Sequence, residues 1–182
     1  MHALSHQNLP RHRSGFTVLE LLVVLFIIFV VLGLILPTTS ALRNAGRRRR
    51  AAMEAQSIIR AIKTYRNVYG HWPLQTTDTA DYTWTNSTPV ISALTTNILL
   101  NPRQTHLIEI PDDAFNNGAF LDPWNRSYII ALDYNEDGHL HIDLTVAFQT
   151  PGTTNIRNET VAVMSAGPDP HDASGRIYSW TR

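Results

Sequence analysis

The sequence predicts an α+β protein in which a long N-terminal hydrophobic helix packs on a small antiparallel sheet of three or four strands. Three observations predict this class: an apolar run from Phe16 to Leu36, an amphipathic pattern that continues to Tyr69, and short strand-like segments in the second half of the chain. We therefore expect a long helix over residues 16–69 and a globular domain over residues 70–182.

The apolar run is long enough to cross a membrane. Its 21 residues would reach roughly 31 Å as a helix, about the thickness of a bilayer core. The fifteen Leu, Val, Ile and Phe residues between Leu21 and Leu36 favour insertion by at most about 5–9 kcal/mol. Glu20 opposes this by at most about 3 kcal/mol. We therefore expect residues 16–36 to span a membrane once.

A secretory signal peptide is the alternative for this region. Basic residues lead the run, and Thr39-Ser40-Ala41 could serve as a small-residue cleavage site, so the mature chain would start at Leu42. The apolar stretch is longer than a usual signal core, however, and Glu20 lies within it. A carboxylate at such a place is expensive and points to a function.

The residues around the start of the run resemble a known processing site. Ser14-Gly15-Phe16-Thr17-Val18-Leu19-Glu20-Leu21-Leu22 is similar to the prepilin site of type IV pilins and type II secretion pseudopilins. The resemblance implies that residues 1–15 are a leader peptide, that prepilin peptidase cuts between Gly15 and Phe16, and that the new amine of Phe16 is N-methylated. Glu20 would then pair with the Phe16 ammonium of a neighbouring subunit during filament assembly.

The orientation of the chain in the membrane is predicted differently by charge and by resemblance. Two basic residues precede the apolar run and five follow soon after it, which would place the globular domain in the cytoplasm. The resemblance implies the bacterial inner membrane with the globular domain in the periplasm. We follow the resemblance, because the processing motif is more specific than a charge count.

The helix should be weakest just beyond the membrane-length run. Pro37 removes a backbone hydrogen bond to Gly33 and clashes with its carbonyl, so we expect a helix break there. Arg47 to Arg50 follow, and four consecutive residues point in nearly all directions around a helix. We interpret them as an anchor at lipid headgroups that also meets carboxylates of neighbouring subunits. No nucleic-acid partner is expected, because no basic and aromatic surface accompanies them.

Apolar positions then recur at spacings of three and four up to Tyr69, and Gly70 and Pro73 end the helix. Between Thr76 and Thr96 we expect a loop with one short helix. Residues 107–110 are a candidate strand, and residues 112–118 are rich in turn formers.

Two alternating segments predict a hairpin. Residues 128–132 and 139–146 are joined by residues 133–138, and in the second segment every other residue is apolar, which should turn that face toward the helix. Residues 161–164 supply a third strand.

A narrower resemblance extends over the globular part. Asp122-Pro123-Trp124-Asn125-Arg126-Ser127-Tyr128 resembles the Asp-Pro-Trp-Gly-x-Pro-Tyr segment of the major pseudopilin, with Asn125 at the glycine position, where it tolerates a positive φ. Ser165-Ala166-Gly167-Pro168-Asp169 resembles its Ser-x-Gly-x-Asp turn. The absence of cysteine fits a pseudopilin better than the many pilins that carry a disulfide, and it excludes a thiol nucleophile.

Calcium is the one cofactor that the sequence suggests. Asp133, Asn135 and Asp137 have the spacing of the start of a calcium loop, but Leu144 occupies the place of its final glutamate, and an ion-free hairpin turn explains the same residues. The resemblance also implies calcium in the C-terminal loop, where Asp169 and Asp172 could bind it. Gly175-Arg176 replaces the acidic pair expected there.

The chain contains no phosphate-binding loop and no catalytic motif, so we expect a structural protein and not an enzyme. The favoured function is a subunit of a type II secretion pseudopilus, a homo-oligomeric filament for protein export. Its implied partners are prepilin peptidase, the inner-membrane assembly platform, minor pseudopilins and the lipid bilayer. The alternatives are a type IV pilus subunit for adhesion, motility or DNA uptake, and a secreted calcium-binding module.

The net charge of the chain is zero, but its two halves carry opposite charges, which indicates two parts in different surroundings. Residues 1–70 carry ten Lys and Arg against two carboxylates, which gives +8, and residues 71–182 carry five against thirteen, which gives −8.

Overall fold

The computed structural model describes residues 15–74, 80–95 and 97–180, without the side chains of residues 34–41. The expected leader peptide, apart from Gly15, lies outside these residues. The chain divides into two units, residues 1–43 and 44–182, and each is described by itself. One helix, α1, contributes residues to both.

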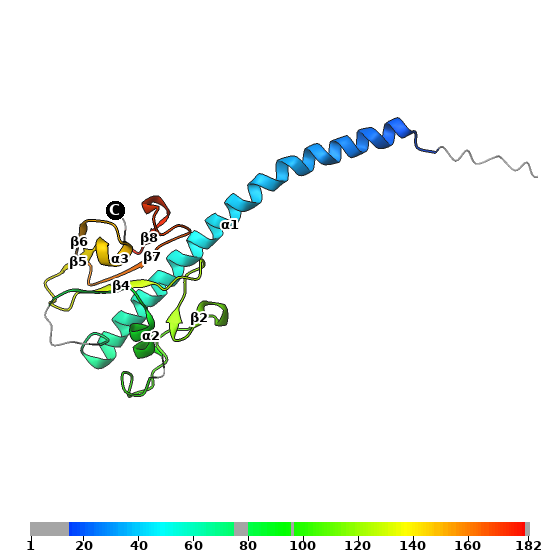
Figure 1. Cartoon of the computed structure of the whole chain (residues 1–182). Helices are drawn as coiled ribbons and strands as arrows, with labels where there is room; N and C mark the ends of the chain where they lie inside the picture. Colours follow the sequence, from blue (N-terminus) through cyan, green and yellow to red (C-terminus); the bar gives the residue numbers. More distant parts are fainter. Residues whose placement is uncertain (1–14, 75–79, 96, 181–182) are drawn as a thin grey trace, which may run out of the picture. The chain divides into compact units, whose positions relative to one another are not determined.

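The long helix predicted from the sequence is present as α1, Val18–Tyr69. It ends at Gly70, which adopts a φ of 79° and donates its N–H to the carbonyl of Arg66 at 2.7 Å. Only glycine takes this left-handed conformation without strain, so the sequence sets the end of the helix. In the globular unit α1 lies against the sheet (Figure 1), and Ile58, Ile62 and Tyr65 are buried there.

The sheet has four antiparallel strands in the order β1-β4-β7-β8. They are β1 Tyr82–Trp84, β4 Ile129–Leu132, β7 Val161–Ser165 and β8 Ile177–Tyr178. In the central pair, Ile130 lies opposite Val163 and Leu132 opposite Val161. The α+β class and the small antiparallel sheet expected from the sequence are therefore confirmed.

Both faces of the central strands are covered, which explains why β4 and β7 read as continuous apolar runs. Ile130 and Leu132 belong to the core formed with α1 and with α2, Thr88–Leu94. Ile129 and Ala131 face a second core on the opposite side. The alternation of side chains along a strand produces this division.

The strand pairing around the second core differs from the predicted hairpin, so that prediction was wrong. The segment expected to pair with residues 128–132 forms β5, His139–Asp143, which pairs instead with β6, Thr153–Arg157, in a sheet of its own. Leu140 and Ile142 are buried as predicted, but in the second core and not against α1. The period-two pattern identified the buried face and could not identify the pairing partner.

The same segment ends earlier than predicted. The residues after β5 form a short helix, α3, Leu144–Phe148, and Asp143 caps its N-terminus. The Asp143 carboxylate accepts the N–H of Thr145 at 2.8 Å. Val146, expected to be buried in a strand, is exposed on α3.

The remaining elements lie in the middle and at the end of the chain. The short helix expected before residue 96 is α2, whereas β1 was not predicted. Residues 107–110 are not a strand. A 3₁₀ helix, η1 Asp112–Ala114, leads into the hairpin of β2 Phe115–Asn116 and β3 Ala119–Phe120, and a second one, η2 Ala173–Gly175, precedes β8.

Candidate functional site

Gly15, Phe16 and Thr17 immediately precede α1, and all three are exposed. The hydroxyl of Thr17 accepts the N–H of Glu20 at 3.2 Å and so caps the first turn. Thr17 and Glu20 have the spacing of a capping box, a signal in the sequence that could have identified the start of the helix. The expected cleavage position therefore lies in accessible chain just outside a capped helix.

The Glu20 side chain is exposed in the first turn of α1 and makes no hydrogen bond or ion pair with the residues that the structure describes. The positive end of the helix dipole favours a carboxylate at this place. Glu20 is also the single charged residue between Phe16 and Gly33. Its carboxylate is thus available to a partner outside the chain.

The large apolar side chains of this part of α1 are all exposed. At least 46% of the surface of each is accessible between Phe16 and Leu32, and for Phe16 the figure is 75%. Exposed apolar surface of this extent is characteristic of contact with other proteins or with lipid. This half of α1 is the candidate assembly surface.

No helix within the part of the chain that the structure describes is sufficiently long and apolar to span a membrane. The segment predicted to do so, residues 16–36, includes three residues whose side chains lie outside the described set. The backbone of α1 is helical through Gly33 and Pro37. The expected helix break stays a prediction, and the side chain of Pro37 lies outside the described residues.

The run Arg47 to Arg50 does not act as one group. Arg50 forms two hydrogen bonds with the carboxylate of Asp113, at 3.0 and 3.1 Å, and its Nε donates to Glu54 at 2.7 Å. The hydrogen bonds with Asp113 raise the pKa of Arg50, and the guanidinium lowers the pKa of Asp113. Arg50 thus holds α1 to η1 within its own subunit, a role that the sequence did not reveal.

Glu54 extends this network into the core. Its second carboxylate oxygen accepts the hydroxyl of Tyr128 at 2.6 Å, and Tyr128 is fully buried. Burial raises the pKa of Tyr128, and the hydrogen bond to Glu54 adds to the effect. The hydroxyl therefore stays protonated and serves as a permanent donor that ties β4 to α1.

The two segments that resemble the major pseudopilin contact each other. Asp122 is buried, and one of its carboxylate oxygens accepts the N–H groups of Trp124 and Arg126, both at 2.9 Å. The other oxygen accepts the hydroxyl of Ser165 at 2.6 Å. Arg126 donates in turn to the carbonyls of Gly167 and Pro168.

Two backbone positions in these turns require special residues. Asn125 adopts a φ of 62°, as predicted for the residue at the glycine position. Gly167 has a φ of 72°, and a Cβ there would lie 2.2 Å from the carbonyl oxygen of Gly175. The turn after β7 therefore fits only glycine.

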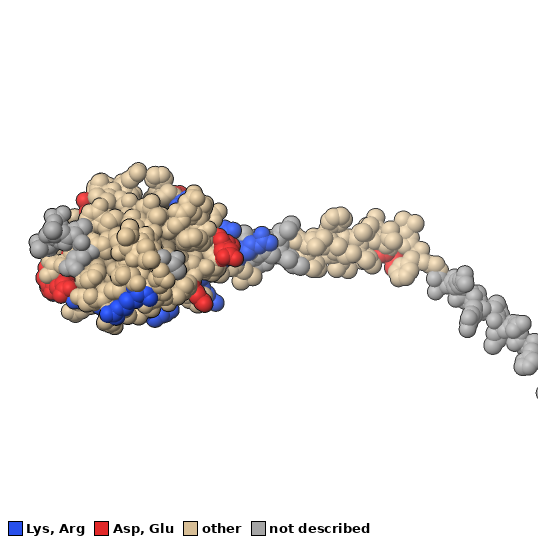
Figure 2. Space-filling model, turned by 90° about the horizontal axis from the view of Figure 1, so that it is seen from below, with Lys and Arg blue, Asp and Glu red and all other residues tan. Residues whose placement is uncertain are grey.

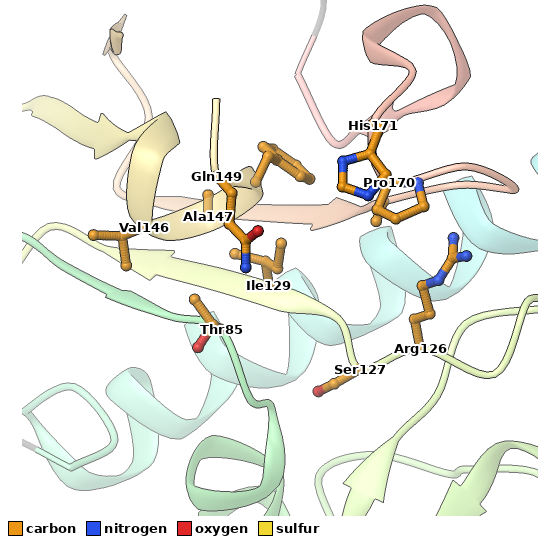
Figure 3. A pocket seen from close by; sticks show the side chains of 11 residues that line it. Thr85, Arg126, Ser127, Ile129, Val146, Ala147, Gln149, Pro170 and His171 are labelled. Carbon is orange, nitrogen blue, oxygen red and sulfur yellow. The ribbon is translucent and has the colours of Figure 1, made fainter. Parts of the chain in front are cut away.

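A cavity of about 480 Å³ opens beside these turns, between α3, β4 and the loop after β7. Figure 3 shows Gln149 and Ile129 on one side of the cavity and Arg126 and His171 on the other. Ser127 also lines it, but its hydroxyl donates to Ser87 at 2.9 Å and not to a histidine. We assign no chemistry to this cavity.

The first proposed calcium loop is closed by its own hydrogen bonds. The two carboxylate oxygens of Asp133 accept the N–H groups of Glu136 and Gly138, at 2.6 and 3.3 Å. Asn135 donates to Asp137 at 3.1 Å. These contacts are those of an ion-free turn between β4 and β5.

In the second proposed calcium loop, the carboxylates likewise accept hydrogen bonds from residues of the loop itself. Asp169 accepts the N–H of His171, and Asp172 accepts the N–H and the hydroxyl of Ser174, which lowers the pKa of Asp172. Among the described residues no group of three or more His, Cys, Asp or Glu could hold a metal ion. Calcium binding at either loop stays a prediction from the sequence, and we derive no function from it.

Arg176 occupies the centre of this C-terminal loop. It is 7% exposed, and its guanidinium donates to the hydroxyl of Thr150 at 2.7 Å and to the carbonyl of Pro170 at 3.1 Å. It also stacks over the ring of Phe148, 4.1 Å from its centre. A buried cation thus joins the loop to α3.

The start of α1 thus combines a capped first turn, an exposed apolar surface and one unpaired carboxylate, Glu20, among the described residues of that half of the helix. Residues 10–36 match the family model of the prokaryotic N-terminal methylation motif. The chain thus carries a type IV pilin-like prepilin signal, which implies processing by prepilin peptidase and, in general, filament assembly. No curated protein and no solved structure matches the chain.

Proposed function

We propose that the protein is a structural subunit of a type II secretion pseudopilus. In this proposal it is held in the bacterial inner membrane by residues 16–36, with its globular domain in the periplasm. Prepilin peptidase removes the leader at Gly15, and an assembly platform together with minor pseudopilins stacks the mature subunits into a filament. The role is structural and involves no enzymatic reaction.

The observation that carries the proposal is the exposed apolar half of α1 with one unpaired carboxylate at its start. An apolar helix surface of this extent needs lipid before assembly and other helices after it. After cleavage the amine of Phe16 and the carboxylate of Glu20 would both lie at this apolar surface. Leaving either charge unpaired in lipid costs several kcal/mol, so pairing between neighbouring subunits sets their register.

The contact between Asp122 and Ser165 supports a pseudopilus over a type IV pilus. It joins the two segments that resemble the major pseudopilin, at 2.6 Å, and does so in a chain without cysteine. The methylation motif itself does not distinguish the two filaments. Deleting the gene separates them, since we expect loss of protein secretion with surface pili unaffected. Loss of pili with normal secretion would favour the pilus subunit.

A substitution at Glu20 tests the assembly role directly. We expect Glu20→Ala to leave membrane insertion and cleavage intact but to abolish incorporation into filaments, because the Phe16 ammonium loses its counter-charge. Glu159→Ala, which removes a carboxylate from the globular unit, is the matched control and should assemble normally. Filaments of normal yield from Glu20→Ala would refute the role assigned to Glu20.

A further inference from the structure

A stripe of unpaired cations runs along the exposed side of α1 within the globular unit. Consecutive residues advance by about 100° around a helix, so spacings of three and four place a set of exposed residues on one face. This set, the basic stripe, consists of Arg49, Met53, Gln56, Arg60, Lys63 and Asn67, and within it the amide of Gln56 donates to the carbonyl of Ser179 at 2.9 Å. It contains three cations and no carboxylate.

Most other basic residues of the globular unit have a partner within the chain, whereas the cations of the basic stripe have none among the described residues. Arg50, Arg66, Arg126 and Arg176 each contact a carboxylate or a carbonyl of their own chain. The side chains of Arg49, Arg60 and Lys63 make no hydrogen bond or ion pair with any described residue. They are thus available to an external partner of negative charge.

The globular unit also presents free carboxylates elsewhere on its surface. Glu109 and Asp112 are exposed and lie beside Asp113, and neither side chain makes a hydrogen bond or ion pair among the described residues. The other exposed carboxylates described in this unit are engaged by their own turns or by arginines. On the face seen in Figure 2, Lys and Arg border Asp and Glu in several places, so the free carboxylates are identified from their contacts and not from a separate acidic patch.

We propose that the basic stripe is an interface between copies of this chain, and that Arg60 and Lys63 of one subunit face Glu109 and Asp112 of a neighbour. The inference rests on the proposed filament and names the contact between its globular units. Free cations on one surface and free carboxylates on another are complementary between copies. Stacking copies along a filament brings unlike surfaces of neighbouring subunits together.

The charge and length of the basic stripe favour a second copy of the chain over lipid or nucleic acid as its partner. From Arg49 to Lys63 the stripe rises about 21 Å, whereas the headgroup layer on one side of a bilayer is only about 5–8 Å thick. No aromatic residue lies on the stripe, so it lacks the stacking platform of single-stranded nucleic-acid sites. The carboxylates of a neighbouring subunit fit both its length and its sign.

Cross-linking between introduced thiols locates the contact, since the chain has no cysteine of its own. Copies with Lys63→Cys and copies with Glu109→Cys, carrying different tags, are produced together as full chains and treated with a short bismaleimide. We expect a cross-linked dimer with both tags. Replacing Lys63→Cys by Arg157→Cys, an exposed cation off the stripe, should give none. Equal yields from the two pairs would overturn the proposal.

Charge reversal then tests whether the contact contributes to assembly. We expect Arg60→Glu with Lys63→Glu to lower filament yield by about tenfold, since two attractive pairs become repulsive, and Glu109→Lys with Asp112→Lys in the same chain to restore it. Arg157→Glu alone and Lys63→Glu alone change the net charge equally at exposed sites, and we expect only Lys63→Glu, which lies on the stripe, to lower the filament yield.

The outcomes separate this inference from the proposed function. Wild-type chain that forms no filament would refute the proposed function. Wild-type filaments that are lost in Glu20→Ala but retained in the stripe variant would overturn the interface alone. A stripe variant that assembles normally yet no longer binds anionic vesicles or single-stranded DNA would assign the stripe to lipid or to nucleic acid instead.

Discussion

Asp122 shows how a single buried carboxylate organises two distant segments. It accepts two backbone N–H groups of its own turn and the hydroxyl of Ser165 across the core. The Ser165 hydroxyl also accepts the N–H of Gly167 at 3.0 Å. If the carboxylate were lost, the Ser165 hydroxyl would be buried without its acceptor and the two half-buried N–H groups would lose theirs, which explains why both turns need these residue types.

Asn125 gives a clean test of the conformation of the Asp122 turn. Its φ of 62° is costly for alanine and easy for glycine. We expect Asn125→Ala to lower the free energy of unfolding by about 1 kcal/mol, while Asn125→Gly should leave it close to the wild-type value. Chemical denaturation of the full chain in detergent measures both. Equal stability of the two variants would contradict the strained conformation.

Arg176 gives a test of how the C-terminal loop is held. Removing its buried guanidinium leaves the hydroxyl of Thr150 and the carbonyl of Pro170 without this donor, so we expect Arg176→Ala to destabilise the fold by about 2 kcal/mol. Arg176→Lys should recover only part of the loss, because lysine lacks the planar group that stacks on Phe148. Thermal melting in detergent provides the comparison.

The same melting measurement tests calcium. Because the oxygens of both proposed loops are occupied by their own turns, we expect the melting temperature of the wild-type chain to be the same with calcium and with a chelator. A rise in the melting temperature with calcium would support the calcium prediction made from Asp133, Asn135 and Asp137.

At the scale of elements, the central contact is between α1 and the sheet. Tyr128, the residue before β4, donates to Glu54, and Glu54 accepts from Arg50, which also pairs with Asp113 of η1. Three separate segments are therefore connected by one chain of hydrogen bonds. Arg50 lies one turn before Glu54 on α1, so the helix itself fixes the spacing of the network.

The clamp of Arg50 on Asp113 predicts an acid dependence. The pKa of Asp113 is lowered in the folded state from its ordinary value of 3.8, so the pair contributes stability above that pH and loses it as the pH falls through the lowered pKa. We expect Asp113→Asn to be less stable than wild type near neutral pH. The difference should shrink in acid, as measured by melting across the pH series. A difference independent of pH would contradict this role of the carboxylate.

The sequence predicted those elements whose signals are local. Gly70 ended α1 where expected, and the apolar run of β4 marked a buried strand. The pairing of β5 with β6 could not be predicted, because alternation identifies a buried face and not its partner. Arg50 was missed for the same reason: its role depends on Asp113, 63 residues away along the chain.

At the scale of the whole molecule, the net charge is zero, but positive and negative charges are concentrated in different parts of the chain. Cleavage after Gly15 would remove Arg11 and Arg13, so residues 16–70 would carry a side-chain charge of +6, eight cations against two carboxylates, compared with −8 in residues 71–182. Such a chain is complementary to its own copies, and we expect filament yield to fall as salt screens these charges. Sedimentation of sheared filaments over a salt series measures this. A yield independent of salt would contradict the electrostatic contact.

The N-terminus of the mature protein tests the central claim most directly. Purification of the chain from membranes, followed by mass spectrometry of its N-terminal peptide, should identify N-methylated Phe16 as the first residue, because residues 10–36 match the methylation motif. A mature chain that starts at Leu42, after the alternative cleavage site, would contradict the filament function and favour a secreted protein.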